Sequence, residues 1–190
     1  MSKAFIQSQI LLIADNFHRL ADLAPLVEQV VETCTAALRA GNKIIFCGNG
    51  GSAADSQHLA AELVGRYKLN RKAMNAIALT VDTSILTAVA NDYGYETIFA
   101  RQLEGIGKPG DVLIGLSTSG NSQNIILAME LAREMEITTV ALTGVEGGGM
   151  EKLADCALAV PSSMTNNIQE MHIALGHIIC GMVEQSIYGN

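Results

Sequence analysis

The residues with the clearest potential for chemistry lie in one stretch, Ser52–Tyr67, which directly follows the glycine-rich segment Gly48–Gly51. The stretch reads SAADSQHLAAELVGRY and predicts a helix, on which His58 and Glu62 are four residues apart and share one face. An imidazole and a carboxylate placed in this way can bind a metal or move a proton. A purely structural histidine fits the same position, so the pair alone leaves both interpretations open; Arg66, four residues after Glu62, is explained by a simple helix-stabilising ion pair.

Two loops, each expected between a strand and a helix, have the composition of ligand-binding loops. In the first, Asn49, Gly50 and Gly51 allow a ligand to approach backbone N–H groups, and Ser52 either caps the helix or donates its hydroxyl. The second, Ser117–Ser122, reads STSGNS and has four hydroxyl residues in six, more than helix capping needs. Together, the two loops predict a single phosphorylated ligand that is bound without a basic side chain.

A third group of polar residues lies in the segment IQEMHIALGH near the carboxyl end. Gln169 and His177 share a broad helix face but are about 12 Å apart along the axis, so one metal reaches both only with long side-chain reach or a distorted helix. His172 is the competing histidine, and a lone histidine on an apolar face is more often a satisfied core residue. Asn91 and Asp92 follow a helical pattern, where Asp92 either binds sugar hydroxyls or ends a helical turn.

Short apolar runs alternate with helical patterns along the chain, which predicts an α/β fold with a parallel sheet covered by helices on both faces. The expected strands are 43–47, 76–80, 111–117, 138–142 and 156–160. The expected helices are 3–40 with a break near Pro25, then 52–66, 83–104, 121–135 and 165–188, with a short turn at 150–154 and a flexible loop at 147–149. The helices of residues 1–40 have apolar faces without an assigned sheet partner, and we expect them to pack against other subunits.

The composition excludes several classes of partner. The chain has 190 residues, 49% hydrophobic and 16% charged, with a net charge of −7. This acidic balance argues against nonspecific binding to nucleic acid or anionic lipid, and no apolar run approaches a membrane span. Four scattered cysteines without a CxxC pair predict buried thiols in a reducing compartment, and we expect a cytoplasmic protein. They are Cys34, Cys47, Cys156 and Cys180.

Four motifs, taken together and in this order, resemble the sedoheptulose-7-phosphate isomerases, also called phosphoheptose isomerases, of the SIS sugar-isomerase superfamily. They are CGNGGSAADSQHLAAELVGRY, AVANDYGYE, GDVLIGLSTSGNS and IQEMHIALGH. The resemblance covers nearly the whole chain, although the STSGNS loop alone marks only the superfamily. One departure is Asn166-Asn167, where the family often has Ala-Arg or Asp-Arg, so a charged substrate contact is not expected there.

The resemblance implies a three-layer αβα sandwich with a five-stranded parallel sheet, as a single SIS domain over 1–190 whose helices at 1–40 take part in oligomerisation. It implies a homotetramer with sites between subunits, which interconverts sedoheptulose 7-phosphate and D-glycero-D-manno-heptose 7-phosphate for lipopolysaccharide or related glycans. It gives Glu62 and His177 as the catalytic pair, and one zinc ion per subunit at His58, Glu62, Gln169 and His177. The implied substrate contacts are Asn49, Gly50, Gly51, Ser52, Glu62, Asn91, Asp92, Ser117, Thr118, Ser119, Ser122 and Gln169.

The expected mechanism is aldose–ketose isomerisation through an enediol, with Glu62 as carbon base and His177 as the acid or base near the oxygens. The two roles are exchangeable at this stage, and a carboxylate bound to zinc is a weaker base. A non-catalytic SIS scaffold that binds the bacterial replication initiator is the alternative, disfavoured because Glu62 and His177 are both present. A regulatory sugar-phosphate sensor ranks last, because the chain carries no basic DNA-binding module.

Overall fold

A five-stranded, all-parallel sheet forms the centre of the computed structural model, which describes residues 2–189. The strands are β1 (Ile44–Gly48), β2 (Ala76–Ala78), β3 (Val112–Leu116), β4 (Thr138–Thr143) and β5 (Cys156–Ala159). Their spatial order is β2-β1-β3-β4-β5, so the chain reverses its direction of travel across the sheet between β1 and β3. In open α/β sheets, ligands bind in the crevice outside the carboxyl ends of the strands at such a switch point.

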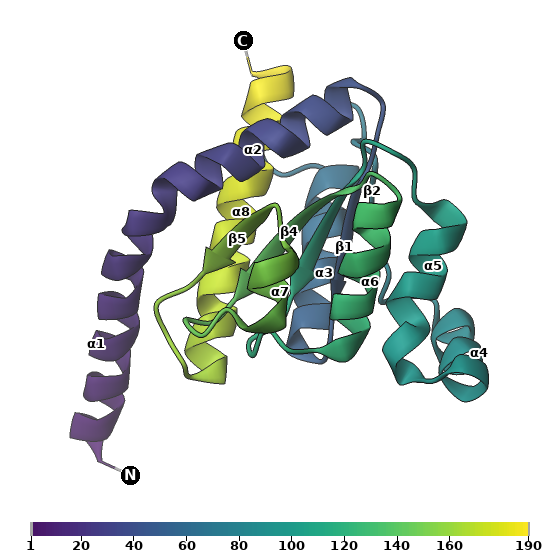
Figure 1. Ribbon diagram of the computed structural model, residues 1–190. Helices are drawn as coiled ribbons and strands as arrows, with labels where there is room; N and C mark the ends of the chain where they lie inside the picture. Colours follow the sequence, from purple (N-terminus) through teal and green to yellow (C-terminus); the bar gives the residue numbers. More distant parts are fainter. Residues whose placement is uncertain (1, 190) are drawn as a thin grey trace.

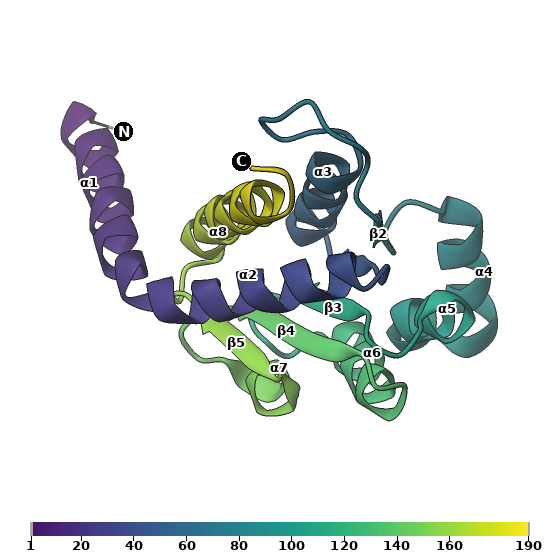
Figure 2. The same ribbon diagram turned by 90° about the horizontal axis from the view of Figure 1, so that it is seen from above.

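Helices cover both faces of the sheet, as the alternating pattern predicts (Figures 1 and 2). The three-layer αβα arrangement and the parallel sheet are therefore confirmed. One face carries α2 (Ala24–Arg39), α3 (Gly51–Val64) and α8 (Thr165–Tyr188). The other carries α5 (Ile98–Ile106), α6 (Gln123–Glu134) and α7 (Gly148–Leu153), with α4 (Thr83–Tyr93) beside α5 at the β2 end of the sheet.

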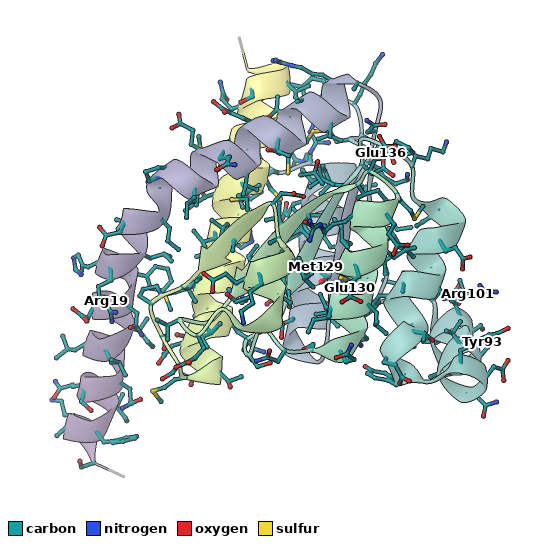
Figure 3. The ribbon with its side chains drawn as sticks, in the orientation of Figure 1. Arg19, Tyr93, Arg101, Met129, Glu130 and Glu136 are labelled. Atoms are coloured by element: carbon teal, nitrogen blue, oxygen red, sulfur yellow. The ribbon has the colours of Figure 1, made fainter. Side chains whose placement is uncertain are left out.

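Alternate residues of each strand supply two separate cores. On β1, Ile44 and Phe46 pack towards α2, α3 and α8, whereas Ile45 and Cys47 pack towards α5 and α6. Both faces are apolar because both are covered, which is the expected composition of a parallel sheet. On α6, consecutive residues differ in burial: Met129 is fully buried in the core, and Glu130 is exposed on the surface (Figure 3).

The amino-terminal helices differ in how they pack. α1 (Lys3–Leu20) leaves the body of the protein at an angle (Figure 1). Several of its apolar side chains are exposed. α2, by contrast, packs against α8 and the sheet and buries Val27, Val30 and Val31 in the core. The break lies at the short 3₁₀ turn Ala21–Leu23, just before the expected position near Pro25. α2 begins at Ala24 and includes Pro25 in its first turn, where proline is well tolerated.

Two other boundaries differ from the sequence-based prediction. The expected helix 83–104 is two helices, because Gly94 takes a φ of 97° and interrupts the chain between α4 and α5. The expected flexible loop 147–149 is instead the start of α7, which begins at Gly148. Across the described residues, no helix is both long and apolar enough to traverse a membrane.

Candidate active site

The register of the sheet brings the two predicted ligand loops together. β1 pairs with β3 over its whole length, with Gly48 opposite Leu116, so the loops that follow these strands begin side by side. The amides of Asn49 and Asn124 join the loops by a reciprocal pair of hydrogen bonds of 2.9 and 2.8 Å. The Tyr95 hydroxyl donates a further hydrogen bond of 3.0 Å to Asn49 Oδ1, which fixes the amide orientation.

The hydroxyls of the second loop converge on one another. Ser117 Oγ lies 2.8 Å from Ser122 Oγ and 3.4 Å from Ser119 Oγ. Ser122 is the N-cap residue of α6, yet its side chain makes no capping hydrogen bond. Ser119 Oγ also accepts a 3.2 Å hydrogen bond from the Asn121 N–H, but capping does not explain the Ser122 hydroxyl. The three hydroxyls form a polar cradle beside the amino end of a helix, where an anion is stabilised. Thr118, the fourth hydroxyl residue, is partly buried in the same loop.

The first loop turns sharply into α3. Gly50 has a φ of 56° and is the N-cap residue, so the helix begins at Gly51. Ser52 is therefore inside the first turn and is not the cap, and it is buried. A glycine at position 50 is required because this backbone conformation is strained for a residue with a Cβ.

Three side chains from two helices form a compact cluster at the outer face of α3 and α8. The ligand atoms of His58, Glu62 and His177 all lie within 4.8 Å of one another. His58 Nε2 is 3.2 Å from Glu62 Oε1 and 2.9 Å from His177 Nε2. Two imidazole nitrogens and a carboxylate oxygen this close together favour a shared positive charge, either a proton or a metal ion.

The two histidines of α8 have different environments. His172 is fully buried, and its Nε2 lies 3.1 Å from the carbonyl oxygen of Thr143. Burial lowers the pKa of His172 to about 4, with the Thr143 hydrogen bond acting weakly in the opposite direction. His172 is therefore a neutral core residue, and His177 is the histidine available for chemistry.

Gln169 is beside the first loop rather than in the three-residue cluster. A Cβ added at Gly51 would lie 2.7 Å from Gln169 Nε2, so this side chain rests on the start of α3. Gly51 precedes His58 by seven residues, which is about 10 Å along a helix. Gln169 thus borders the space between the loops and the cluster, and its role as a metal ligand stays a prediction.

Comparison with known proteins identifies the family of the chain. The SIS domain family model matches residues 13–144. The phosphoheptose isomerase of Akkermansia muciniphila is 72% identical over 97% of this chain and 98% of its own, and that of Rhodospirillum rubrum is 53% identical over 97% and 96%. The chain belongs to the phosphoheptose isomerases of the SIS family.

Solved structures of phosphoheptose isomerases have the same fold over almost the full chain. That from Francisella tularensis superposes with a TM-score of 0.94 at 35% identity and covers 97% of this chain and 100% of its own. That from Neisseria gonorrhoeae gives 0.91 at 39% identity over 96% and 98%. The α/β fold expected from the sequence is therefore the fold of this family.

The remaining predicted contacts, Asn91 and Asp92, are exposed at the carboxyl end of α4. Asn91 Nδ2 donates a 2.8 Å hydrogen bond to Asp92 Oδ1, and α4 lies at the opposite edge of the molecule from α8 (Figure 2). The single chain does not bring these two residues to the cluster. Their part in a site between subunits stays a prediction.

Sequence reasoning missed several polar residues in or beside the site. Asp55 is partly buried one turn before His58, and burial raises its pKa while the charges of His58 and His177 act to lower it. Its i,i+3 spacing from His58 was the available signal. Asn124 and Tyr95 gave no local signal, because their contacts with Asn49 join residues 75 and 46 positions apart.

The donor set of the cluster fits a zinc ion. Zinc in catalytic sites takes three protein ligands from histidine and carboxylate side chains and keeps one position open. His58, Glu62 and His177 provide two ring nitrogens and one carboxylate, and their exposure leaves a side accessible to a ligand. The cluster can therefore bind a metal of this kind or transfer protons without one.

Proposed function

We propose that the protein interconverts sedoheptulose 7-phosphate and D-glycero-D-manno-heptose 7-phosphate, the step that begins heptose synthesis for lipopolysaccharide or related glycans. The relatives named phosphoheptose isomerase support this reaction, at identities of up to 72% along the chain. The observation that carries the proposal in the structure is the His58–Glu62–His177 cluster beside two ligand loops at the sheet's switch point. A non-catalytic scaffold for the replication initiator is not favoured, because it has no use for such a cluster.

The second loop is proposed to hold the phosphate. The hydroxyls of Ser117, Thr118, Ser119 and Ser122, together with the amino end of α6, replace the cations that an acidic protein of charge −7 does not gather there. Asn49, Gly50, Gly51, Ser52 and Gln169 then contact the sugar chain. Anchoring the phosphate places the reacting carbon at a fixed distance from Glu62, which converts binding energy into orientation.

Isomerisation requires a proton to leave the carbon next to the carbonyl and another to move between two oxygens. We assign the first transfer to Glu62 and the second to His177, since both side chains reach the same open space. The exchanged assignment is chemically equivalent for an enediol. A bound zinc ion, which His58, Glu62 and His177 would hold with Gln169 as the further predicted ligand, would supply polarisation of the substrate carbonyl.

A homotetramer is proposed as the working form, with 1–40 as a helical extension of a single domain spanning 1–190. α1 exposes Phe5, Ile6, Ile10 and Leu11, with exposed fractions from 49 to 69%. A groove of about 590 Å³ beside it is lined by apolar residues of α1, α2 and α8, among them Phe17, Leu20, Ile178 and Met182. Apolar surface of this extent is typical of an oligomer interface.

The four free, buried cysteines fit a reducing compartment, and we propose the cytoplasm.

The decisive test is turnover of sedoheptulose 7-phosphate by Glu62→Gln, with Glu130→Gln on the exposed face of α6 as the matched control. We expect Glu62→Gln to lose turnover by about 10²-fold or more, with an unchanged oligomeric mass, because it removes the proton acceptor. Glu130→Gln should behave as the parent protein. Near-normal turnover by Glu62→Gln refutes the proposed base, and the absence of turnover in the parent protein refutes the proposed reaction.

A further inference from the structure

The imidazole of His177 is held between two other rings. His58 meets it edge-on, with ring centroids 5.0 Å apart and an interplanar angle of 75°. Tyr67 stacks on it with centroids 5.9 Å apart and an angle of 26°. Tyr67 follows the carboxyl end of α3 by three residues and belongs to none of the predicted ligand sets. None of the roles assigned to the catalytic pair, the metal ligands or the substrate contacts accounts for this stacking.

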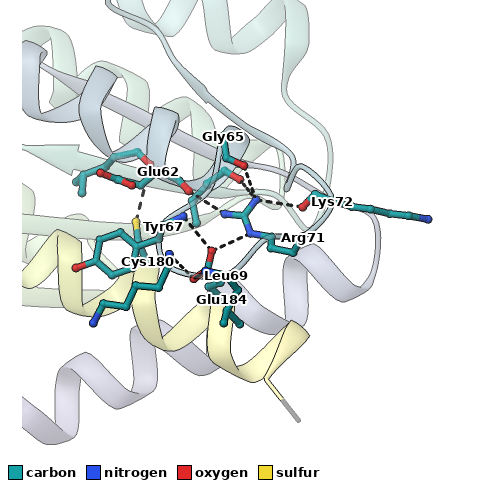
Figure 4. A network of polar contacts seen from close by, with 11 residues as sticks. Glu62, Gly65, Tyr67, Leu69, Arg71, Lys72, Cys180 and Glu184 are labelled. Carbon is teal, nitrogen blue, oxygen red and sulfur yellow. Dashed lines mark hydrogen bonds and ion pairs between the residues drawn. The ribbon is translucent and has the colours of Figure 1, made fainter.

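The backbone of Tyr67 is itself fixed by a buried ion pair (Figure 4). Glu184 Oε1 accepts a 3.0 Å hydrogen bond from the Tyr67 N–H, and Oε2 accepts from the N–H groups of Lys68 and Leu69 at 2.8 and 2.9 Å. Arg71 donates 3.0 Å from Nε to Glu184 Oε1, and both side chains of this pair are only 2% exposed. The loop that carries Tyr67 is thus attached to α8, the helix that carries His177.

Arg71 connects the same network to the end of α3. Its guanidinium donates to the carbonyl oxygens of Glu62 at 2.8 Å and Leu63 at 2.7 Å (Figure 4). One ion pair therefore joins three parts of the site: the backbone of Glu62, the backbone of Tyr67 and the helix of His177. Because both charges are buried, displacing either part leaves a charge without its partner, which is costly.

α8 also provides space for the tyrosine ring. A Cβ added at Gly181 would lie 2.9 Å from Tyr67 Cε1, closer than ordinary van der Waals contact. Gly181 is one helical turn after His177, so it is on the same face. The absence of a side chain at position 181 allows the phenol ring to lie flat against the helix and reach the imidazole.

We propose that Tyr67 is a positioning residue that fixes the plane of the His177 imidazole so that its Nε2 points to His58 and Glu62. The proposal rests on the function proposed above. A histidine ring rotates over a broad, roughly two-fold χ2 range unless it is restrained. Metal-binding histidines are usually restrained by a hydrogen bond at the second ring nitrogen. Here the stacked phenol, held by Glu184 and Arg71, provides the restraint.

The test measures Zn²⁺ affinity of the metal-stripped, full-length protein by competition with a chromophoric chelator, together with the thermal midpoint of the metal-free form. Tyr67→Leu removes the ring and should weaken Zn²⁺ binding by about 10-fold or more, the usual effect of losing a group that orients a ligand. Tyr67→Phe keeps the ring and should restore affinity to within about twofold. Tyr93→Leu, at a tyrosine on α4 that is 60% exposed, is the matched control and should change nothing.

Gly181→Ala keeps the phenol but displaces it, and should weaken Zn²⁺ binding in the same direction as Tyr67→Leu. This variant also decides the question if Tyr67→Leu does not fold. A role in packing alone predicts lower thermal midpoints with unchanged affinity in both variants, and that result overturns the proposal. If the parent protein turns over sedoheptulose 7-phosphate but binds no Zn²⁺, the positioning proposal is overturned while the isomerase function stands.

Discussion

Replacing Glu184 with glutamine should cost far more stability than the same change at an exposed ion pair. Glu184 and Arg71 are each 2% exposed, and the carboxylate accepts four hydrogen bonds, two at each oxygen. Glutamine keeps the shape but turns one oxygen into a donor. Two N–H groups then lose their acceptor, and the Arg71 charge stays buried without a counter-charge.

The size of the effect follows from these losses. Each buried donor left unsatisfied costs about 1–3 kcal/mol, which gives about 2–6 kcal/mol for two. Breaking a buried ion pair by removing one partner costs about 3–5 kcal/mol, so we expect about 4 kcal/mol for Glu184→Gln. The matched control is Glu104→Gln, because the Arg101–Glu104 side chains are 52% and 58% exposed and such a pair contributes at most about 1 kcal/mol.

The assay is urea unfolding of both variants and the parent at one protomer concentration, since oligomer formation contributes to apparent stability.

The pH dependence of stability provides a second check. Burial alone would raise the pKa of Glu184, but the hydrogen bonds from Lys68, Leu69, Tyr67 and Arg71 outweigh it and lower the pKa below 4.5. Its stabilisation is therefore complete above pH 4.5 and is lost as pH falls through the lowered value, so the gap between parent and variant should narrow there. Equal costs for Glu184→Gln and Glu104→Gln at pH 7 refute the reasoning.

Three other predictions concern single residues. The pKa of His172 is lowered from 6.5 to about 4, so the unfolded chain takes up a proton first as pH falls from 6.5 to 4. Up to about 3 kcal/mol of stability should be lost in that window, and unfolding curves of His172→Gln should show a flatter dependence on pH. Asn124→Leu removes the amide that orients Asn49 and should raise KM about tenfold in steady-state assays. Tyr95→Phe removes a more exposed hydrogen bond to Asn49 and should raise KM less. Ser122→Ala removes a hydroxyl from the phosphate cradle and should raise KM about 10-fold or more with kcat largely kept; a fall in kcat alone contradicts a binding role.

Local patterns in the sequence were sufficient to predict the elements of the fold. Alternation of apolar runs with helical periodicity gave the strands and the cover on both faces, since each signal lies within a few residues. The failures were also local in origin. Residues 83–104 were interpreted as one helical pattern, although a helix end before Gly94 was one of the two interpretations of Asp92. The glycines before Met150 were interpreted as a loop, although α7 begins among them.

The assembly of the site was harder to predict because it depends on contacts between distant residues. Spacing identified His58 and Glu62 as a pair, but it could not choose between His172 and His177, since both lie on one amphipathic helix. The fold distinguishes them, because His172 is buried in the core and His177 is not. The family resemblance supplied His177 at once, whereas Tyr67, Arg71 and Glu184 became visible only through contacts that join residues more than 100 positions apart.

The position of the cluster on the chain has a consequence for biosynthesis. His58 and His177 are separated by 119 positions, and the helix that carries His177 follows all five strands. Because a chain is made from its amino end, all five strands leave the ribosome before His177 does. A nascent chain at that stage presents only His58 and Glu62, so any metal that needs all three side chains would bind only after the last helix has joined α3.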